Sequence, residues 1–290
     1  MSKRDLENIS LANRRLANRR LENLAYGMLG SVADAEDVVQ EARLKVLQLA
    51  SPPLNPQAYL FRVVTNLALD RLRREKVSRA HYPGPWLPEP LPTERIVELA
   101  HSLSIGLLMM LERLSPAERV VCVLREGFDL GFSEIADVLE IKVAACRQRY
   151  KRAKKNISRE KRFATPMAVQ KTLLDKLILG VAEEDLPGLV SLFSDDAIVY
   201  ADRDGLVSAA ICPVTEPERI AQVMLHLARR ADAEGAISYF EVALNGGVGL
   251  LLLQNGELHS CIQFDGENGR ITRLYVVRNP EKLVGLAGLI

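Results

Sequence analysis

The chain has 290 residues, of which 48% are hydrophobic and 26% are charged, and its formal net charge is +1. This length accommodates two or three domains, and the composition excludes a disordered or collagen-like chain. No apolar run approaches the ~20 residues that cross a bilayer, and the charged start lacks a signal core, so we expect a cytoplasmic protein with no membrane partner. The four cysteines are scattered singly, which predicts no disulfide framework, metal site or cofactor.

The small net charge conceals two oppositely charged parts. Residues 1–163 carry 28 Lys and Arg against 20 Asp and Glu, a net of +8, whereas residues 164–290 carry 10 against 17, a net of −7. A basic part favours a polyanionic partner such as nucleic acid, and the acidic part is typical of a separate module. Chance clustering on solvated helix faces gives the same asymmetry, so charge alone does not decide between them.

The first 48 residues carry the period of two helices that meet at Gly30 and Ser31. In the second helix, apolar residues recur from Ala35 to Val46 and predict a buried stripe. The opposite face is acidic and suits the positive N-terminal end of the helix dipole. This face is either a docking surface for a partner or ordinary solvated surface, and its members are Asp34, Glu36, Asp37, Gln40 and Glu41.

A third helix is predicted from Pro56, because Asn55 supplies an N-cap and proline suits the first helical position. Its apolar residues form one buried stripe and leave polar and cationic groups together on a more open face. Cations there could hold phosphates while Tyr59 or Asn66 contacts bases, although basic residues near a helix C-terminus also follow from the dipole. The candidate nucleic-acid residues of this face are Tyr59, Arg62, Asn66, Asp70, Arg73 and Arg74.

A proline-rich connection follows. Residues 81–93 include five prolines, which forbids a helix and favours a stiff, extended linker. Trp86, the only tryptophan, offers too much apolar surface for a solvated spacer, so we expect it to pack on a neighbouring domain. A helix over about 95–114 completes the connection.

From Ser115 the sequence predicts a helix-turn-helix. Ser115 and Glu118 form a capping box, Ser133 is expected to cap a short helix, and a longer helix follows over about 144–158. Such a helix fits the major groove of DNA, where Arg and Gln pair with base edges and Lys neutralises phosphate. A merely soluble cationic helix is the alternative, but the dense positive charge favours DNA. The candidate DNA-binding residues are Arg147, Gln148, Lys151, Arg152, Lys154 and Lys155.

From residue 165 the pattern changes to helices, followed by strands over 237–278 that are separated by Asn-Gly and glycine-rich turns. This pattern predicts an α+β fold with an antiparallel meander. We do not expect an enzyme, because loop aspartates commonly form turns and lone histidines are commonly structural. In the rival, enzymatic interpretation, the candidates for a general base are Asp202, Asp204, His226 and His259.

With these segments in place, the sequence resembles the sigma-70 family, specifically the extracytoplasmic-function (ECF) RNA polymerase sigma factors. The resemblance lies in LAYGMLGSVADAEDVVQEARLKVLQ at 24–48, NPQAYLFRVVTNLALDRLRR at 55–74 and the helix-turn-helix strings at 114–140 and 144–155. It implies that the acidic-faced helix docks on the β′ clamp of RNA polymerase, that the third helix reads the −10 element, and that the helix-turn-helix binds the −35 element. The implied partners are core RNA polymerase, through its β′ clamp and β flap, and promoter DNA.

Two further strings, PGPWLPEPL at 83–91 and VVRNPEKL at 276–283, are similar to those of the SigJ-like group of these sigma factors. Members of this group carry a SnoaL-like C-terminal domain. The resemblance implies an NTF2-like cone that can hold a small apolar ligand, and regulation in cis through the linker and the tail. The residues concerned are Trp86, Asn279, Pro280 and Lys282.

The chain departs from the family pattern at two places. Relatives usually show glycine at the position of Glu140 and serine at that of Lys142, so the turn lacks glycine and the recognition helix lacks a capping acceptor, a loss of about 1 kcal/mol. Relatives also carry an Asp-Gly-Gly-Gly-Arg/Lys-type stretch where this chain has DRDGL at 202–206. The first difference bears on promoter preference, and the second bears on any role that depends on the glycine loop.

The prediction is therefore a multi-domain protein with two all-α sigma domains and a C-terminal α+β, SnoaL/NTF2-like cone. The expected divisions are a −10 and clamp-binding helical domain, a proline-rich linker with its connecting helix, a −35-binding helix-turn-helix domain and a regulatory domain, at residues 1–80, 81–110, 111–163 and 164–290. The predicted function is promoter selection by an ECF sigma factor that is regulated in cis. The alternative is a ligand-responsive helix-turn-helix regulator that acts without core polymerase.

Overall fold

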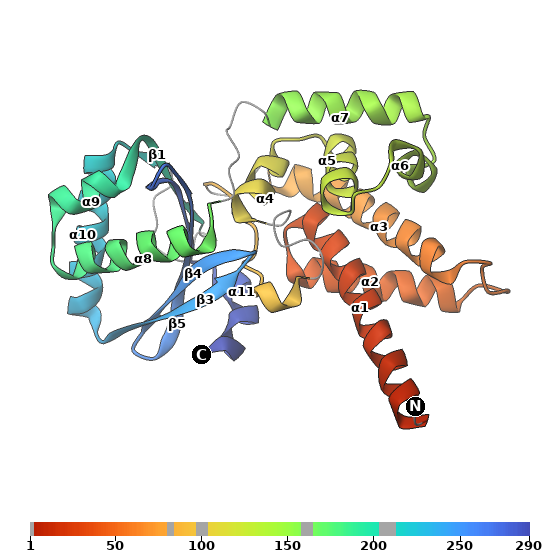
Figure 1. The fold of residues 1–290 in the computed structure, drawn as a ribbon, viewed down its shortest axis with the longest axis horizontal. Helices are drawn as coiled ribbons and strands as arrows, with labels where there is room; N and C mark the ends of the chain where they lie inside the picture. Colours follow the sequence, from red (N-terminus) through yellow and green to blue (C-terminus); the bar gives the residue numbers. More distant parts are fainter. Residues whose placement is uncertain (1–2, 80–83, 97–103, 158–164, 203–212) are drawn as a thin grey trace. The chain divides into compact units, whose positions relative to one another are not determined.

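The structure, a computed structural model shown in Figure 1, contains two compact units. The helical unit comprises residues 1–80, 94–103 and 110–160, and the sheet unit comprises residues 81–93, 104–109 and 161–290. Among the helices that the structure describes, none is long and apolar enough to cross a membrane. The described residues are 3–79, 84–96, 104–157, 165–202 and 213–290.

Three N-terminal helices pack on one another: α1 (Lys3–Leu29), α2 (Val32–Leu47) and α3 (Pro56–Arg79). Gly30 turns the chain after α1 with a φ of 71°, and the Ser31 hydroxyl caps α2 by accepting from the Asp34 N–H at 3.3 Å. The Asn55 side chain accepts from the Ala58 N–H at 3.0 Å, which confirms the predicted start of α3. Apolar side chains from all three helices are buried, among them Leu24, Met28, Val38, Val39, Ala42, Val64, Ala68 and Leu72.

The middle of the chain contains the predicted helix-turn-helix. In chain order it forms η1 (Thr93–Arg95), α4 (Ile105–Glu112), α5 (Pro116–Cys122), the π-helical turn η2 (Val123–Gly127), α6 (Phe132–Leu139) and α7 (Val143–Ile157). The predicted capping box starts α5, because the Ser115 hydroxyl accepts from the Glu118 N–H at 3.3 Å and the Glu118 carboxylate accepts from the Ser115 N–H at 3.1 Å.

The start of α6 differs from the prediction. Ser133 is not its N-cap, because the helix begins at Phe132 and Gly131 occupies the cap position. The Glu134 carboxylate accepts from the Gly131 N–H at 2.6 Å, so an acidic side chain, rather than a hydroxyl, satisfies an orphan N–H at this end of the helix.

The turn between α6 and α7 passes through Glu140, whose φ of 53° lies in the left-handed region. Glycine adopts this conformation easily, whereas a residue with a Cβ loses about 1 kcal/mol there. The backbone of the turn therefore has the form that glycine favours, although the sequence supplies glutamate.

The sheet unit is built on one mixed six-stranded sheet with the strand order β2-β1-β6-β5-β4-β3. The last four strands are antiparallel, as predicted, and Asn-Gly turns with positive φ at both residues join β3 to β4, β4 to β5 and β5 to β6. β1 runs parallel to β6. The strands are β1 (Phe193–Asp202), β2 (Val214–Thr215), β3 (Ile237–Leu244), β4 (Gly247–Gln254), β5 (Glu257–Glu267) and β6 (Arg270–Val277).

One face of this sheet is covered by the helices α8 (Met167–Ala182), α9 (Leu186–Leu192) and α10 (Pro217–Glu234). Figure 1 shows these three helices gathered on one side of the strands. The core between them is apolar throughout and includes Leu174, Leu189, Phe193, Ile220, Leu250, Phe264 and Leu274. A helix-covered sheet confirms the predicted α+β fold of the C-terminal part.

The opposite face of the sheet is covered by other parts of the chain. Because side chains alternate along a strand, Leu251 and Tyr275 face away from the helices α8 to α10. They share a second buried cluster with Leu87 of the linker and Ile105 of α4. The helix α11 (Pro280–Leu283) and the 3-10 helix η3 (Val284–Leu289) close this cluster with Leu283 and Leu286. The linker is thus part of the core of the sheet unit.

Candidate nucleic-acid interface

Helix α7 has two chemically distinct sides. Cys146, Ala153 and Ile157 are buried and hold the helix on its domain. The opposite side is a stripe of exposed residues, which begins with two neighbours and continues at intervals of three or four positions along one helix face. This stripe consists of Arg147, Gln148, Lys151 and Lys155. Its side chains can donate hydrogen bonds to the acceptors on base edges and phosphates.

The other two predicted cations of α7 turn toward their own domain. The Lys154 ammonium lies 3.0 Å from the Glu126 carboxylate and 5.5 Å from the centre of the Tyr150 ring. Burial lowers the pKa of Lys154, but the hydrogen bond to Glu126 and its charge outweigh burial and raise this pKa overall. The Arg152 guanidinium lies 3.6 Å from Glu118. These two cations are partly neutralised within the domain, whereas Arg147 and Lys151 are not paired with a described carboxylate in any ion pair of the structure.

Helix α6 fixes the orientation of α7. The ring of Phe132 packs edge-on against Tyr150 with 5.4 Å between centroids, and the guanidinium of Arg147 lies 6.0 Å from the centre of the Phe132 ring. Ile135 and Ala136 are buried beneath them. Phe132 of α6 therefore packs against Arg147 and Tyr150 in the first half of α7.

Helix α3 presents the second predicted nucleic-acid face. Asn66, Asp70, Arg73 and Arg74 are exposed and Tyr59 is half-buried, so the members share one side of the helix as the spacing predicts. Asp70 and Arg73 pair with each other at 2.8 Å, and the Arg74 side chain donates to the Asp70 carbonyl at 3.4 Å. Arg62 differs from the rest, because its guanidinium donates to Glu140 at 3.0 Å and to the Asp137 carbonyl at 3.1 Å.

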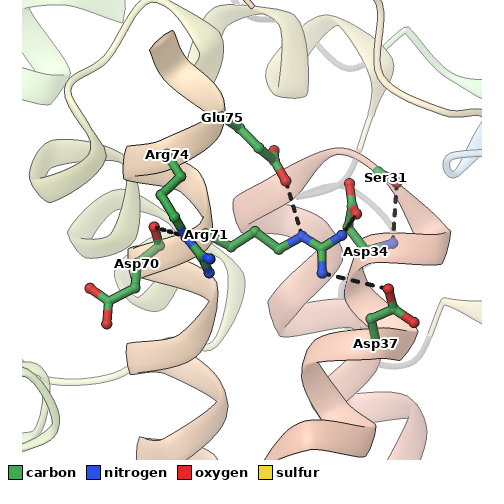
Figure 2. Close-up of polar contacts among 7 residues, drawn as sticks. All are labelled: Ser31, Asp34, Asp37, Asp70, Arg71, Arg74 and Glu75. Carbon is green, nitrogen blue, oxygen red and sulfur yellow. Dashed lines mark hydrogen bonds and ion pairs between the residues drawn. The ribbon is translucent and has the colours of Figure 1, made fainter. Parts of the chain in front are cut away.

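The acidic face of α2 is organised by an arginine from α3, as Figure 2 shows. Arg71 points across to α2, where it contacts the carboxylate of Asp34 and lies 3.5 Å from that of Asp37. Glu75 accepts from the Arg71 Nε at 3.1 Å. The carboxylates raise the pKa of Arg71 against the opposing effect of its burial. Sequence periodicity groups Arg71 with the basic end of α3 and does not reveal this inward contact.

The remaining members of this face differ in accessibility. Glu36 pairs with Arg95 of η1, and Glu41 pairs with Lys45 one turn along α2 at 3.0 Å. Gln40 is exposed, and the side chains of Asp37 and Glu41 are 65% and 54% exposed. The outward-facing part of the face therefore centres on Asp37, Gln40 and Glu41. The face continues into Leu44 and Leu47, which are 59% and 80% exposed. The predicted face consisted of polar residues alone and did not include these two leucines.

The linker and the tail meet at a buried ion pair in the sheet unit. Asp202 is fully buried, and its carboxylate accepts from the Leu87 N–H at 3.0 Å and from the Lys282 ammonium at 2.5 Å. Lys282 also donates to the Leu87 carbonyl at 2.6 Å and lies 4.1 Å from the centre of the Trp86 ring. Asn279 caps α11 by accepting from the Glu281 N–H at 2.9 Å, and Pro280 is the first helical residue.

A second contact fixes the linker farther along. The side-chain oxygen of Asn245 accepts from the Leu91 N–H at 3.0 Å, and the backbone N–H of Asn245 donates to the Leu91 carbonyl at 2.8 Å. The Thr93 hydroxyl accepts from the Gly246 N–H at 3.1 Å. The Asn-Gly pattern predicts only a hairpin turn at Asn245. It gives no sign that the side chain and the backbone N–H of this residue also bind the linker.

The three candidates for a general base that lie in the described residues are not brought together. Asp202 serves the linker, His226 is exposed on α10, and His259 lies 2.5 Å from a guanidinium nitrogen of Arg278. Burial and the charge of Arg278 lower the pKa of His259. Asp204 lies outside the described residues. The described candidates therefore occupy separate structural positions.

Comparison with known proteins agrees with this arrangement. Residues 15–77, which include α2 and α3, match the family model of sigma-70 region 2, and residues 105–157, which include α5 to α7, match that of sigma-70 region 4. The helical unit thus defines a promoter-recognition protein of the sigma-70 class.

The relatives place the chain more narrowly. It is 31% identical to the ECF RNA polymerase sigma factor SigJ of Mycobacterium tuberculosis over 91% of this chain and 89% of that protein. It is 28% identical to the probable ECF sigma factor SigI of the same species, over 90% of each chain. The crystal structure of M. tuberculosis SigJ superposes with a TM-score of 0.79 at 29% identity, over 95% of this chain and 98% of that one. The chain belongs to the ECF RNA polymerase sigma factors, a family of transcription initiation factors rather than enzymes.

Proposed function

We propose that this chain binds core RNA polymerase through α2 and selects promoters by placing α3 on the −10 element and α7 on the −35 element. The proposal is carried by three outward-facing polar surfaces that follow one another along the chain in the order of the sigma-70 regions. A regulator that acts without polymerase is not favoured, because region 2 is matched as well as region 4. We place the protein in the cytoplasm, where bacterial polymerase works.

The polymerase-docking surface is the outward part of α2, formed by Asp37, Gln40, Glu41, Leu44 and Leu47. Its carboxylates and amide precede two exposed leucines, so the complementary surface carries cations beside a small apolar patch. Arg71 is a positioning residue for this surface, since it holds the N-terminal half of α2 through Asp34 and Asp37.

Charge reversal tests the docking surface. We expect the double substitution Asp37→Lys and Glu41→Lys to weaken binding of core polymerase at least tenfold, because two attractions become repulsions at once. Titration of labelled full-length protein with core enzyme gives the dissociation constant.

A matched pair of substitutions is the control for this experiment. Asp175→Lys with Glu183→Lys changes the net charge equally, and both residues are exposed on the sheet unit. The control is expected to bind core polymerase like the original protein. Equal binding by all three proteins would contradict the docking surface, and run-off transcription from a promoter library would test the proposed function as a whole.

We further propose that the sheet unit regulates the sigma regions in cis by holding the linker. Residues 84–93 are held by Asp202, Asn245 and Lys282, so their conformation depends on the folded C-terminal domain. Removal of residues 164–290 is expected to change polymerase binding or transcription, and an unchanged result in both assays would contradict regulation in cis.

We also propose that the C-terminal domain binds a small apolar ligand, and this proposal depends on regulation in cis. The apolar face that such a ligand would use is filled by Leu87, Ile105 and Leu286. A ligand would therefore compete with the linker, and binding would be seen as release of Trp86 from its contact with Lys282.

A further inference from the structure

Arg62 of sigma-70 region 2 contacts region 4 in the helical unit. This residue belongs to the proposed −10 face of α3, but both arms of its guanidinium are occupied, one by the end of α6 and the other by the turn that follows it. One arm donates to the Glu140 carboxylate at 3.0 Å and the other donates to the Asp137 carbonyl at 3.1 Å. A carboxylate and a carbonyl are the same kinds of acceptor that phosphate and base edges offer.

Aromatic packing supports this polar contact. Phe61, the neighbour of Arg62, packs edge-on against Phe128, with ring centroids 5.7 Å apart. Phe128 is only 9% exposed, and the guanidinium of Arg20 on α1 lies 5.8 Å from the centre of its ring. Helices α1 and α3 thus contact the helix-turn-helix domain around Phe128, beside the Arg62 contact.

The conformation of Glu140 gives a second, independent indication. Its φ of 53° is one that glycine adopts without strain, so glutamate here carries a backbone cost. Among the described residues, Arg62 is the hydrogen-bond and ion-pair partner of the Glu140 carboxylate. Glu140, which has the strained backbone, thus also supplies the carboxylate that accepts from Arg62 of the −10 face.

We propose that Glu140 and the Asp137 carbonyl compete with −10 DNA for Arg62, so that the uncomplexed protein closes its own −10 face with its helix-turn-helix domain. We name this contact, formed by Arg62, Glu140 and the Asp137 carbonyl, the Arg62 clasp. The inference rests on the proposed role of α3 in promoter binding. The clasp must open before Arg62 can contact the promoter.

The clasp shifts the equilibrium toward the closed form only moderately. The side chains of Arg62 and Glu140 are 42% and 70% exposed, and solvent screens pairs of this kind. We expect loss of the carboxylate to raise the ratio of open to closed molecules about two- to fivefold, which corresponds to the measured range for exposed pairs. Core polymerase must separate the two regions to place them on two promoter elements. Its binding supplies the rest of the free energy that opens the clasp.

The first test measures closure without DNA. Full-length protein with Cys212→Ser is labelled at Gln57→Cys of α3 and Ser133→Cys of α6, two exposed positions, and energy transfer reports their separation. Glu140→Gln and Glu140→Gly are each expected to raise the open-to-closed ratio two- to fivefold. Arg62→Gln removes both contacts and should raise the ratio at least as much as Glu140→Gln does. The double variant Arg62→Gln with Glu140→Gln should match Arg62→Gln alone, because the Glu140 carboxylate has then already lost its partner.

Asp137→Asn is the matched control. It removes one negative charge three residues before Glu140, near the end of α6, but leaves in place the Asp137 carbonyl, which is the acceptor that Arg62 uses. This variant is expected to keep the original ratio. Equal ratios in Glu140→Gln and Asp137→Asn would overturn the clasp.

The second test measures competition. The uncomplexed Glu140→Gln protein is expected to bind the single-stranded −10 segment of a promoter, selected by run-off transcription, two- to fivefold more tightly than Asp137→Asn does. With core polymerase bound, the two variants should form promoter complexes equally. An opened protein with no gain in DNA affinity would overturn the competition. Loss of DNA binding is expected for Arg62→Ala, and its absence would instead refute the proposed role of Arg62 in reading the −10 element.

Discussion

Replacing Asp202 by asparagine is expected to lower the free energy of unfolding of the sheet unit by about 3 kcal/mol. The substitution removes the counterion of Lys282, whose side chain is only 12% exposed, and breaking a buried pair from one side costs roughly 3–5 kcal/mol. It also weakens the acceptor of the Leu87 N–H. Denaturant unfolding followed by the fluorescence of Trp86, the only tryptophan, measures this loss at the linker itself.

Two further proteins make this experiment decisive. Asp195→Asn removes a carboxylate that is 99% exposed and pairs with Arg270 at 3.5 Å, so no measurable loss is expected. Asp202→Asn combined with Lys282→Met should lose less than the sum of the single changes, because the second change removes the ammonium that has lost the Asp202 carboxylate. A value for Asp202→Asn within 0.5 kcal/mol of the original protein, an order-of-magnitude limit for surface changes, would show that the ion pair does not hold the linker.

Replacing Arg147 and Lys151 by alanine is expected to lower the affinity of the holoenzyme for a promoter with a −35 element by roughly 10- to 100-fold. A good contact between a side chain and a base contributes about 1–3 kcal/mol, and a lost phosphate contact adds to this. Both residues lie on the exposed stripe of α7 and have no acidic partner in the described ion pairs. Promoter binding as a function of salt concentration gives both the affinity and the number of phosphate contacts.

The same helix provides the comparison variant. Arg152→Ala with Lys154→Ala removes two positive charges as well, but these cations lie against Glu118 and Glu126 of their own domain. We expect this pair to cost less than about fivefold, since much of its charge is already neutralised. If it weakened the −35 interaction as much as the first pair, the division of α7 into a DNA stripe and a domain-facing side would be wrong.

Local patterns predicted the helical part well. The capping box at Ser115, the cap at Asn55 and the buried stripe of α2 from Ala35 each depend on residues close in sequence, and each is present in the structure. The cap of α6 was misassigned because Ser133 and Gly131 both stand near the helix start, and only the tertiary position of the Glu134 side chain distinguishes them. Short-range rules fail where two residues compete for one role.

Contacts between distant segments were not predictable in the same way. The parallel pairing of β1 with β6 and the binding of the linker by Asn245 join residues more than 70 positions apart, and no period in the sequence encodes them. Arg62 and Arg71 are nine residues apart and therefore lie on opposite sides of α3, where Arg71 meets the carboxylates of α2 and Arg62 meets Glu140. Which acidic partner each meets depends on how the helices pack.

The capture of residues 84–93 by the sheet unit has a consequence for promoter geometry. Ten residues of extended chain can span about 33 Å, roughly the length of ten base pairs of B-form DNA. While they are held by Asp202 and Asn245, these residues contribute one fixed span between the two promoter elements instead of an adjustable length. We therefore expect the C-terminal domain to restrict the spacer lengths that the holoenzyme tolerates.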